Sequence, residues 1–234
     1  RQMCIRDRCR TLADQVNNYL VSFRHESPTN VGQADSLQGY CADSYLLECE
    51  CPRFGSGEGK GVLKESVRGC DLFIMVDVTN YSLTYRVNGY ENHMSPDNHY
   101  QDLKRIISAA DGKARRINVI MPFLYEGRQH KRSKRESLDC ALMLQELVDM
   151  GVSNILTFDA HDPRVSNSIP LHGFDSFMPT YQFLKALVNS VPDFVIDNDH
   201  LMIISPDEGA MGRAVYFSNI LGVDMGMFYK RRDY

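Results

Sequence analysis

The sequence predicts an α/β protein whose sheets are mainly parallel, and two patterns carry this prediction. Short continuous apolar runs alternate along the chain with segments in which apolar residues recur at helical spacing. The connections between these segments are short, as in domains where a helix follows each strand and covers the sheet. Strands without polar alternation are typical of parallel sheets buried on both faces. We therefore expect helices on both sides of the sheet.

The individual elements follow from these patterns and from turn and capping residues. The predicted strands lie at residues 71–78, 117–122, 154–158, 201–205 and 224–229. The predicted helices lie at residues 96–110, 137–150, 180–189 and 211–221. Ser95 is expected to cap the first of these helices, with Pro96 at its first position, because neither residue disturbs a helix start. Gly151 is expected to end the second helix, since glycine adopts the left-handed conformation found after helix ends.

Length and composition restrict the class of protein. At 234 residues the chain can form one large domain or two small ones, and patterns lapse near Gly173–Pro179, so we expect two units joined there. No apolar run approaches the ~20 residues that span a bilayer, and no secretory signal is evident, so no membrane association is expected. The seven cysteines are odd in number, which favours reduced thiols and a cytoplasmic location.

A basic run lies between a predicted strand and a predicted helix. Residues Arg128–Arg135, RQHKRSKR, hold five Lys and Arg side chains in a chain of net charge −4. A basic loop in this position can bind a polyanion, because its side chains converge with helix-end amides. The alternative is a solvated loop, which is the commoner outcome for a run of charges.

Three further loops follow predicted strands and carry charged or imidazole side chains. They are Asp159–Asp162 (DAHD), Pro206–Ala210 (PDEGA) and Lys230–Arg232 (KRR). Ligands bind at the carboxyl ends of parallel strands, so these loops and the basic run are candidates for one site. Carboxylates and imidazole can hold a divalent cation while Arg and Lys neutralise phosphate oxygens, which suits a metal-bound polyphosphate. Taken singly, each loop has a simpler interpretation. His161 can be an ordinary core or surface histidine, Asp207 and Glu208 can be charges at a helix start, and Lys230–Arg232 can be a solvated tail.

Several strings of this chain resemble one known family. KESVRGCDLFIM, MPFLYEGRQHKR, LTFDAHDPR, IISPDEGAMGRA and FYKRR, in this order, resemble ribose-phosphate pyrophosphokinase, and the resemblance covers most of residues 45–234. It implies two phosphoribosyltransferase-like domains. It also implies Mg2+-dependent transfer of the β,γ-diphosphoryl group of ATP to the C1 hydroxyl of ribose 5-phosphate. The products are AMP and phosphoribosyl pyrophosphate, used in nucleotide biosynthesis, and the family suggests a homo-oligomer in which dimers assemble into a hexamer.

The resemblance assigns roles residue by residue. Phe54 and Glu58 match a nucleotide-binding loop, although Ser56 stands where the family has asparagine. Arg128 and Gln129 match a pair that contacts ATP, followed by His130 where aspartate is commoner. His161 matches a metal ligand. Asp207 is expected to hold metal and begins a pyrophosphate loop, made of Asp207, Glu208, Gly209 and Ala210, in which Ala210 replaces a glycine. Lys230 and Arg232 match a catalytic basic pair.

Departures from the family pattern limit what is expected of this chain. Residues 77–95 are longer and richer in tyrosine than the usual connection, and residues 1–10 match nothing, so they are interpreted as a non-native leader. The paired-acidic ribose 5-phosphate loop is absent. We therefore expect an N-terminal domain at residues 11–173, an incomplete second domain at 174–234, and no turnover by the chain alone.

Two alternatives to the enzyme were weighed. A non-catalytic regulatory homologue need not keep Arg128, His161, Lys230 and Arg232, so their presence favours the enzyme. A nucleic-acid-binding module using the basic run is disfavoured by the net acidity and by the lack of aromatics among the basic residues.

Overall fold

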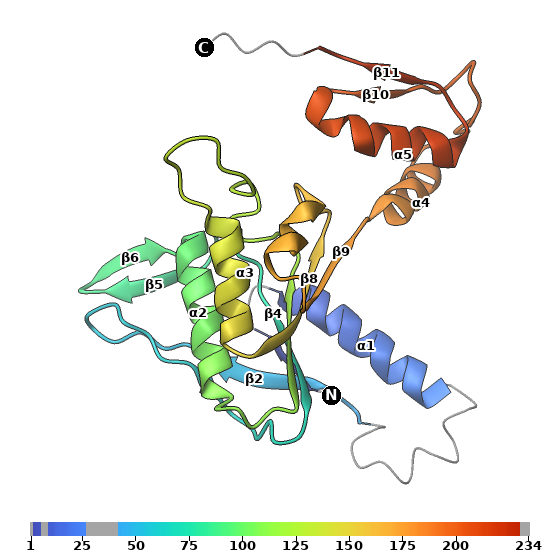
Figure 1. The fold of residues 1–234 in the computed structure, drawn as a ribbon. Helices are drawn as coiled ribbons and strands as arrows, with labels where there is room; N and C mark the ends of the chain where they lie inside the picture. Colours follow the sequence, from blue (N-terminus) through green and yellow to red (C-terminus); the bar gives the residue numbers. More distant parts are fainter. Residues whose placement is uncertain (1, 6–8, 27–41, 230–234) are drawn as a thin grey trace. The chain divides into compact units, whose positions relative to one another are not determined.

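The chain divides into two compact units in a computed structural model, which describes residues 2–5, 9–26 and 42–229 (Figure 1). The first unit spans Arg1–Phe177 and the second Met178–Tyr234. The division lies close to the predicted boundary at residue 173, but strand pairing continues up to Phe177.

The first unit is built on a seven-stranded sheet in the order β3-β2-β1-β4-β7-β8-β9. Its strands are β1 (Gln2–Ile5), β2 (Leu46–Glu50), β3 (Val62–Leu63), β4 (Asp71–Met75), β7 (Arg116–Met121), β8 (Val152–Phe158) and β9 (Gly173–Phe177). All neighbours pair in parallel except β3, which runs antiparallel to β2. The predicted α/β fold with a mainly parallel sheet is confirmed.

Two strands of this sheet lie where the sequence predicted none. Residues Gln2–Ile5, interpreted from the sequence as part of a leader, form β1, which lies inside the sheet and pairs with both β2 and β4. The strand is only four residues long and charged residues follow it, so its apolar signal in the sequence is weak. The second is β9: the sequence indicated a break in regular structure from Gly173, but residues 173–177, GFDSF, form a strand that pairs with β8.

Helices cover both faces of this sheet (Figure 1). Helices α2 (Pro96–Ala109) and α3 (Asp139–Asp149) pack on one face, and α1 (Arg10–Glu26) packs on the other. Strand β4 shows the two faces directly: Leu72 and Ile74 contribute to the core under α2 and α3, while Phe73 and Met75 contact the cluster under α1. Successive side chains of a strand point to opposite faces, so a continuous apolar run fits a sheet covered on both.

The predicted ends of two helices are confirmed. The Ser95 hydroxyl accepts a hydrogen bond from the Asn98 amide at 3.2 Å, and Pro96 begins α2. Gly151 follows α3 with φ +88°, the left-handed conformation that glycine adopts without steric cost.

The buried Asn118 and the partly buried Asn154 link the middle of the sheet. Asn118 on β7 donates its side-chain amide to the carbonyl oxygen of Leu72 at 3.2 Å, and its oxygen accepts from Asn154 Nδ2 on β8 at 2.6 Å. On the far side of Asn154 lies Gly173 of β9, where a Cβ would come within 2.1 Å of Asn154 Oδ1. These side chains satisfy one another inside the sheet, as buried amides require.

Residues 77–95, for which the sequence offered no structural interpretation, contain a β-hairpin. Strands β5 (Thr84–Val87) and β6 (Tyr90–His93) pair antiparallel around a turn at Asn88 and Gly89, both with positive φ. An Asn-Gly pair is the commonest sequence for such two-residue turns. The segment is therefore an ordered projection from the first unit.

The second unit contains α4 (Thr180–Ser190), β10 (Ile203–Ser205), α5 (Met211–Leu221) and β11 (Met225–Met227). Strands β10 and β11 pair in parallel, and α5 connects them. The elements agree with the sequence prediction, and the bounds of α5 match it at both ends. Within the described residues, no helix is both long and apolar enough to cross a membrane.

Replacing Leu144 by alanine should lower the free energy of unfolding by about 2–5 kcal/mol, because its side chain is fully buried between α3 and the sheet. Leu142 lies on the same helix but is 60% exposed, so Leu142→Ala is the matched control and should cost less than about 1 kcal/mol. Chemical denaturation monitored by circular dichroism measures both. Equal losses would show that α3 does not pack as described.

Candidate functional site

Two of the predicted loops lie at neighbouring strand ends in the first unit. Strands β7 and β8 pair in parallel up to Met121 and Thr157, so the segments that follow them leave the same edge of the sheet. These segments carry Arg128–His130 and Asp159–Asp162. The rule that polar loops gather at the carboxyl ends of parallel strands therefore located this pair of loops correctly.

A tight turn presents Arg128 to solvent. The amide of Gly127 donates to the carbonyl oxygen of Leu124 at 3.0 Å, and the amide of Gln129 donates to that of Glu126 at 2.8 Å. Glu126 takes a positive φ of 54°, and Leu124 is buried beneath the turn. The buried leucine and these backbone bonds fix the turn, so the exposed Arg128 side chain starts from a defined position.

His130 joins the two loops. Its Nδ1 lies 3.2 Å from the carbonyl oxygen of Arg128, and its Nε2 lies 3.6 Å from Asp162 Oδ2. Its ring also packs against that of His161, with the centroids 5.0 Å apart. The sequence assigned no role to His130; the clue was a histidine two residues beyond the start of the basic run. In the structure this side chain connects the turn around Arg128 to the loop that carries His161.

Asp162 is held by its own loop. Its carboxylate caps the 3-10 helix Pro163–Ser168 by accepting from the amide of Arg164 at 3.0 Å, and it accepts further bonds from the Arg164 guanidinium. These hydrogen bonds, chiefly those of the guanidinium, hold the pKa of Asp162 well below its usual range. The carboxylate facing His130 is therefore ionised throughout the neutral range.

His161, which the sequence analysis matched to a metal ligand, lies in the loop that follows β8. It is exposed at the end of β8, beside the ring of His130. Among residues 2–5, 9–26 and 42–229, no group of three or more His, Cys, Asp and Glu side chains is arranged to hold a metal ion.

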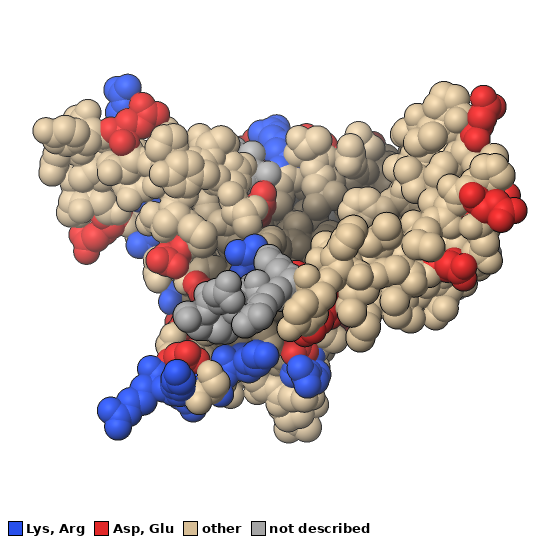
Figure 2. Space-filling view, turned by 90° about the horizontal axis from the view of Figure 1, so that it is seen from above, with Lys and Arg blue, Asp and Glu red and all other residues tan. Residues whose placement is uncertain are grey.

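The rest of the basic run is solvent-exposed. Residues 131–135 form no recorded ion pair with any described residue, and Ser133 instead contacts Glu136 through its amide and hydroxyl. Figure 2 shows Lys and Arg side chains gathered at one edge of the surface in view, with a few acidic residues among them. Unpaired exposed cations can still attract a polyanion at long range. Arg128 is exposed as well, but it lies on a turn whose backbone is held by hydrogen bonds.

The glycine-rich loop with Phe54 and Glu58 follows β2. The Phe54 amide donates to the carbonyl oxygen of Glu58 at 2.7 Å, and the Gly57 amide donates to that of Phe54 at 2.9 Å. The Ser56 hydroxyl contacts Glu58 Oε2 at 2.8 Å, and the Phe54 ring is 53% exposed. The loop is thus ordered with its aromatic ring open to solvent. Within the described part of the chain, no hydrogen bond or ion pair joins it to Arg128 or Gln129.

The predicted pyrophosphate loop belongs to the second unit. Asp207 Oδ1 accepts from the amide of Ala210 at 3.1 Å, and the Ser205 hydroxyl donates to the carbonyl oxygen of Asp207 at 2.7 Å. Asp207 therefore caps the 3-10 turn Glu208–Ala210 that leads into α5. Lys230 and Arg232, predicted to be catalytic, lie outside the described residues.

Removal of the His130 side chain should loosen both loops that it contacts. We expect His130→Ala to speed hydrogen exchange at the Gln129 and Ala160 amides by about fivefold, because a contact of roughly 1 kcal/mol is lost. Exchange measured by NMR reads out each amide. His172→Ala is the control, since His172 is exposed in the same unit. Unchanged exchange in His130→Ala would contradict the link between the loops.

Cys140 should resist alkylation in the folded protein. It is fully buried at the start of α3, and burial, aided by the charge of Glu126, raises the pKa of its thiol to about 11. At pH 8, iodoacetamide should modify the half-buried Cys70 but leave Cys140 intact, because the thiolate is the reactive form. Peptide mass mapping distinguishes the two. Equal modification under native conditions would contradict the described packing of α3.

Comparison with known proteins supplies the family context. Residues 3–151 match the N-terminal domain of ribose phosphate pyrophosphokinase, a match that begins within β1. Ribose-phosphate pyrophosphokinase of Staphylococcus epidermidis is 28% identical over 191 residues, and that of Oceanobacillus iheyensis is 26% identical over 190 residues. Each match covers 80% of this chain and 53% of the relative, so the chain spans about half the length of the curated relatives it matches.

The fold also matches a solved structure. Phosphoribosylpyrophosphate synthetase from Mycobacterium smegmatis superposes with a TM-score of 0.73 over 99% of this chain and 65% of that protein. The sequence identity in this match is 22%, so the likeness concerns the fold.

Proposed function

Because the chain belongs to the ribose-phosphate pyrophosphokinase family, we propose that it serves the magnesium-dependent transfer of the β,γ-diphosphoryl group of ATP to the C1 hydroxyl of ribose 5-phosphate. The products are phosphoribosyl pyrophosphate and AMP, and the setting is cytoplasmic nucleotide biosynthesis. The observation that carries this proposal is the junction of Arg128, His130 and His161 at the adjoining ends of β7 and β8. It joins an exposed guanidinium, carried on a hydrogen-bonded turn, to an exposed imidazole, which together suit a cation-bound polyphosphate.

The electrostatics of the chain support polyphosphate binding. The chain carries a net charge of −4, yet five Lys and Arg residues lie between Arg128 and Arg135 at the strand end. ATP and a sugar phosphate repel each other, so bringing them together needs localised positive charge. In this proposal Arg128 and Gln129 contact the nucleotide, while the exposed cations of residues 131–135 raise the local concentration of anions.

A bound magnesium ion would neutralise phosphate charge during the transfer. Of the described side chains, His161 would hold it in the first unit, and Asp207 is the candidate in the second. One carboxylate oxygen of Asp207 accepts the helix-capping hydrogen bond from the Ala210 amide. We propose that the segment Asp207–Ala210 approaches the diphosphate through its backbone amides, since amides at a helix start attract anions.

The transfer itself needs groups that stabilise charge on the moving diphosphate. The C1 oxygen attacks the β-phosphorus, the bond from that phosphorus to the α–β bridging oxygen breaks, and AMP leaves with the bond electrons. We assign Lys230 and Arg232 to the charge that develops on the diphosphate and on AMP. The ribose 5-phosphate site and a homo-oligomeric assembly belong to the complete protein in this proposal, because the chain spans about half the length of its relatives.

Arg128→Ala should weaken the binding of Mg·ATP by about tenfold to a hundredfold, since a fixed guanidinium–phosphate contact contributes roughly 1.5–3 kcal/mol. Arg135→Ala is the matched control from the same basic run, and at 0.15 M salt it should weaken binding less than about threefold. Isothermal titration calorimetry measures both constants. Equal effects of the two variants would mean that the run acts only as a diffuse charge.

The reaction is tested by AMP release from the full-length protein. It should require both ribose 5-phosphate and magnesium, and Lys230→Ala should reduce kcat at least a hundredfold, because transition-state charge loses a fixed cation. ATP binding without AMP release in the unsubstituted protein would instead identify a non-catalytic homologue. Unchanged kcat in Lys230→Ala would contradict the role of that residue.

A further inference from the structure

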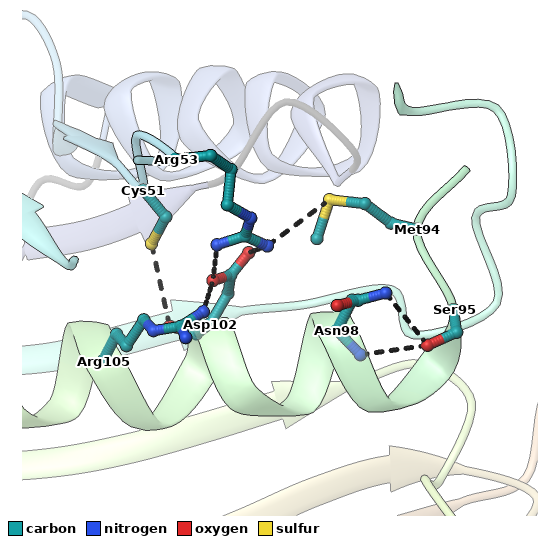
Figure 3. Close-up of polar contacts among 7 residues, drawn as sticks. All are labelled: Cys51, Arg53, Met94, Ser95, Asn98, Asp102 and Arg105. Atoms are coloured by element: carbon teal, nitrogen blue, oxygen red, sulfur yellow. Dashed lines mark hydrogen bonds and ion pairs between the residues drawn. The ribbon is translucent and has the colours of Figure 1, made fainter. Parts of the chain in front are cut away.

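A fully buried carboxylate lies beneath the glycine-rich loop. Asp102 on α2 has no exposed surface and accepts hydrogen bonds from both terminal nitrogens of Arg53, at 2.6 and 2.7 Å, and from Arg105 Nη1 at 2.7 Å (Figure 3). A buried charge is tolerated only where partners of this kind replace its hydration. The two parallel bonds to Arg53 also restrict the guanidinium to one orientation.

Arg53 is the residue immediately before the loop Phe54–Glu58, and it forms the base of that loop. Its backbone pairs with that of Gly59, and the Lys60 amide donates to the carbonyl oxygen of Pro52 at 3.2 Å. A Cβ at Gly59 would lie 2.2 Å from Arg53 Nη1 and 2.9 Å from Arg105 Nη1. The returning strand of the loop therefore passes directly over the ion pair, and a side chain at Gly59 would displace it.

The same guanidinium reaches the β5–β6 hairpin segment. Its central carbon lies 5.1 Å from the ring centre of Tyr85 on β5. Its Nη2 lies 3.9 Å from the sulfur of Met94, as Figure 3 shows. A guanidinium over an aromatic ring is an attractive contact, more so when partly desolvated. Arg53 thus connects helix α2, the base of the glycine-rich loop and the hairpin through one side chain.

The loop and the hairpin line an open pocket of about 390 Å³ between them. Ser56 and Gly57 line it from the loop, and the hairpin contributes Tyr85, Val87, Asn88, Tyr90 and Asn92. Their side chains are aromatic, amide, hydroxyl or aliphatic, and none is charged. They suit a neutral heterocycle, because rings stack on its faces and amides bond to its edge, whereas a phosphate needs cations.

We propose that Arg53 and Asp102 are positioning residues that hold the loop Phe54–Glu58 against the β5–β6 hairpin, so that the pocket between them receives the nucleotide base. The assignment of the base rests on the proposed function. The hairpin then contributes to nucleotide selection, and residues 77–95 acquire a role in the first unit. The competing explanation is that the ion pair only stabilises the fold.

Replacing both partners by apolar residues separates these explanations. The double variant Arg53→Met with Asp102→Leu removes these two charges together, a change that folded proteins often tolerate, and Arg105, whose side chain is 23% exposed, can turn to solvent. Lys104→Met is the control, because Lys104 forms an ion pair with Glu146 at 2.7 Å from the same helix without touching the loop. Hydrogen exchange at the Phe54, Gly57 and Lys60 amides, all hydrogen-bonded in the loop, reports its order independently of any ligand.

Positioning predicts at least a tenfold faster exchange at these amides in the double variant, with the melting temperature and the exchange of β7 unchanged. Lys104→Met should leave the loop amides unaffected. Unaltered loop exchange in a folded double variant would overturn the proposal. If the double variant does not fold, Arg53→Lys, which keeps the charge but loses the paired bonds, should show the same selective increase, and a uniform increase over the whole unit would overturn the proposal.

Ligand binding tests the pocket with two probes, Mg·ATP and inorganic tripolyphosphate, which lacks a base. The double variant and Tyr85→Ala should each weaken ATP binding by about tenfold and leave the affinity for tripolyphosphate unchanged. Equal losses for the two probes, or no loss, would overturn the assignment of the base to this pocket. Failure of the unsubstituted protein to bind ATP would contradict the proposed function, while the exchange measurement would still decide the positioning role.

Discussion

The parallel pairing of β4, β7 and β8 is the constraint on which the first unit depends. It places three apolar strands side by side, so that their alternate side chains bury under α2 and α3 on one face and toward α1 on the other. The same pairing brings the carboxyl ends of β7 and β8 to one edge of the sheet. The turn around Arg128 and the loop that carries His161 meet there because the strands beneath them are hydrogen-bonded neighbours.

Charged side chains in this unit fall into two classes with different consequences. Arg53, Asp102 and Arg105 form a buried network whose geometry is fixed by burial and by short hydrogen bonds. The cations of residues 131–135 are exposed and free to move in solvent, so they act mainly through the field that they create. A site for a large anion benefits from both kinds of charge. Exposed cations attract the anion from a distance, and fixed side chains hold it in one orientation once it is bound.

Much of the fold could be predicted from sequence because its signals are local. Ser95 and Pro96 mark the start of α2, Gly151 marks the end of α3, and the apolar run of β7 is continuous. Short or polar strands escape this kind of prediction: Gln2–Ile5 and Gly173–Phe177 are strands because neighbouring strands pair with them. The hairpin has a local signal of its own in the sequence, the Asn-Gly pair between two short extended segments.

The candidate site could be predicted only in part. Strand-end position identified Arg128 and His161, but the role of His130 depends on how closely two loops approach in space. Asp102 resembles any polar residue in a helical segment, and its burial follows from packing that no local pattern records.

Three neighbouring strands carry a row of contacting residues, Asn118, Asn154 and Gly173. This row restricts which substitutions the sheet can accept during evolution. Asn154 fills the space that a side chain at residue 173 would occupy, and its amide also satisfies Asn118. A larger residue at 173 therefore favours a smaller one at 154, which in turn leaves the side-chain oxygen of Asn118 in need of a new donor. In related proteins, these three positions should change together rather than one at a time.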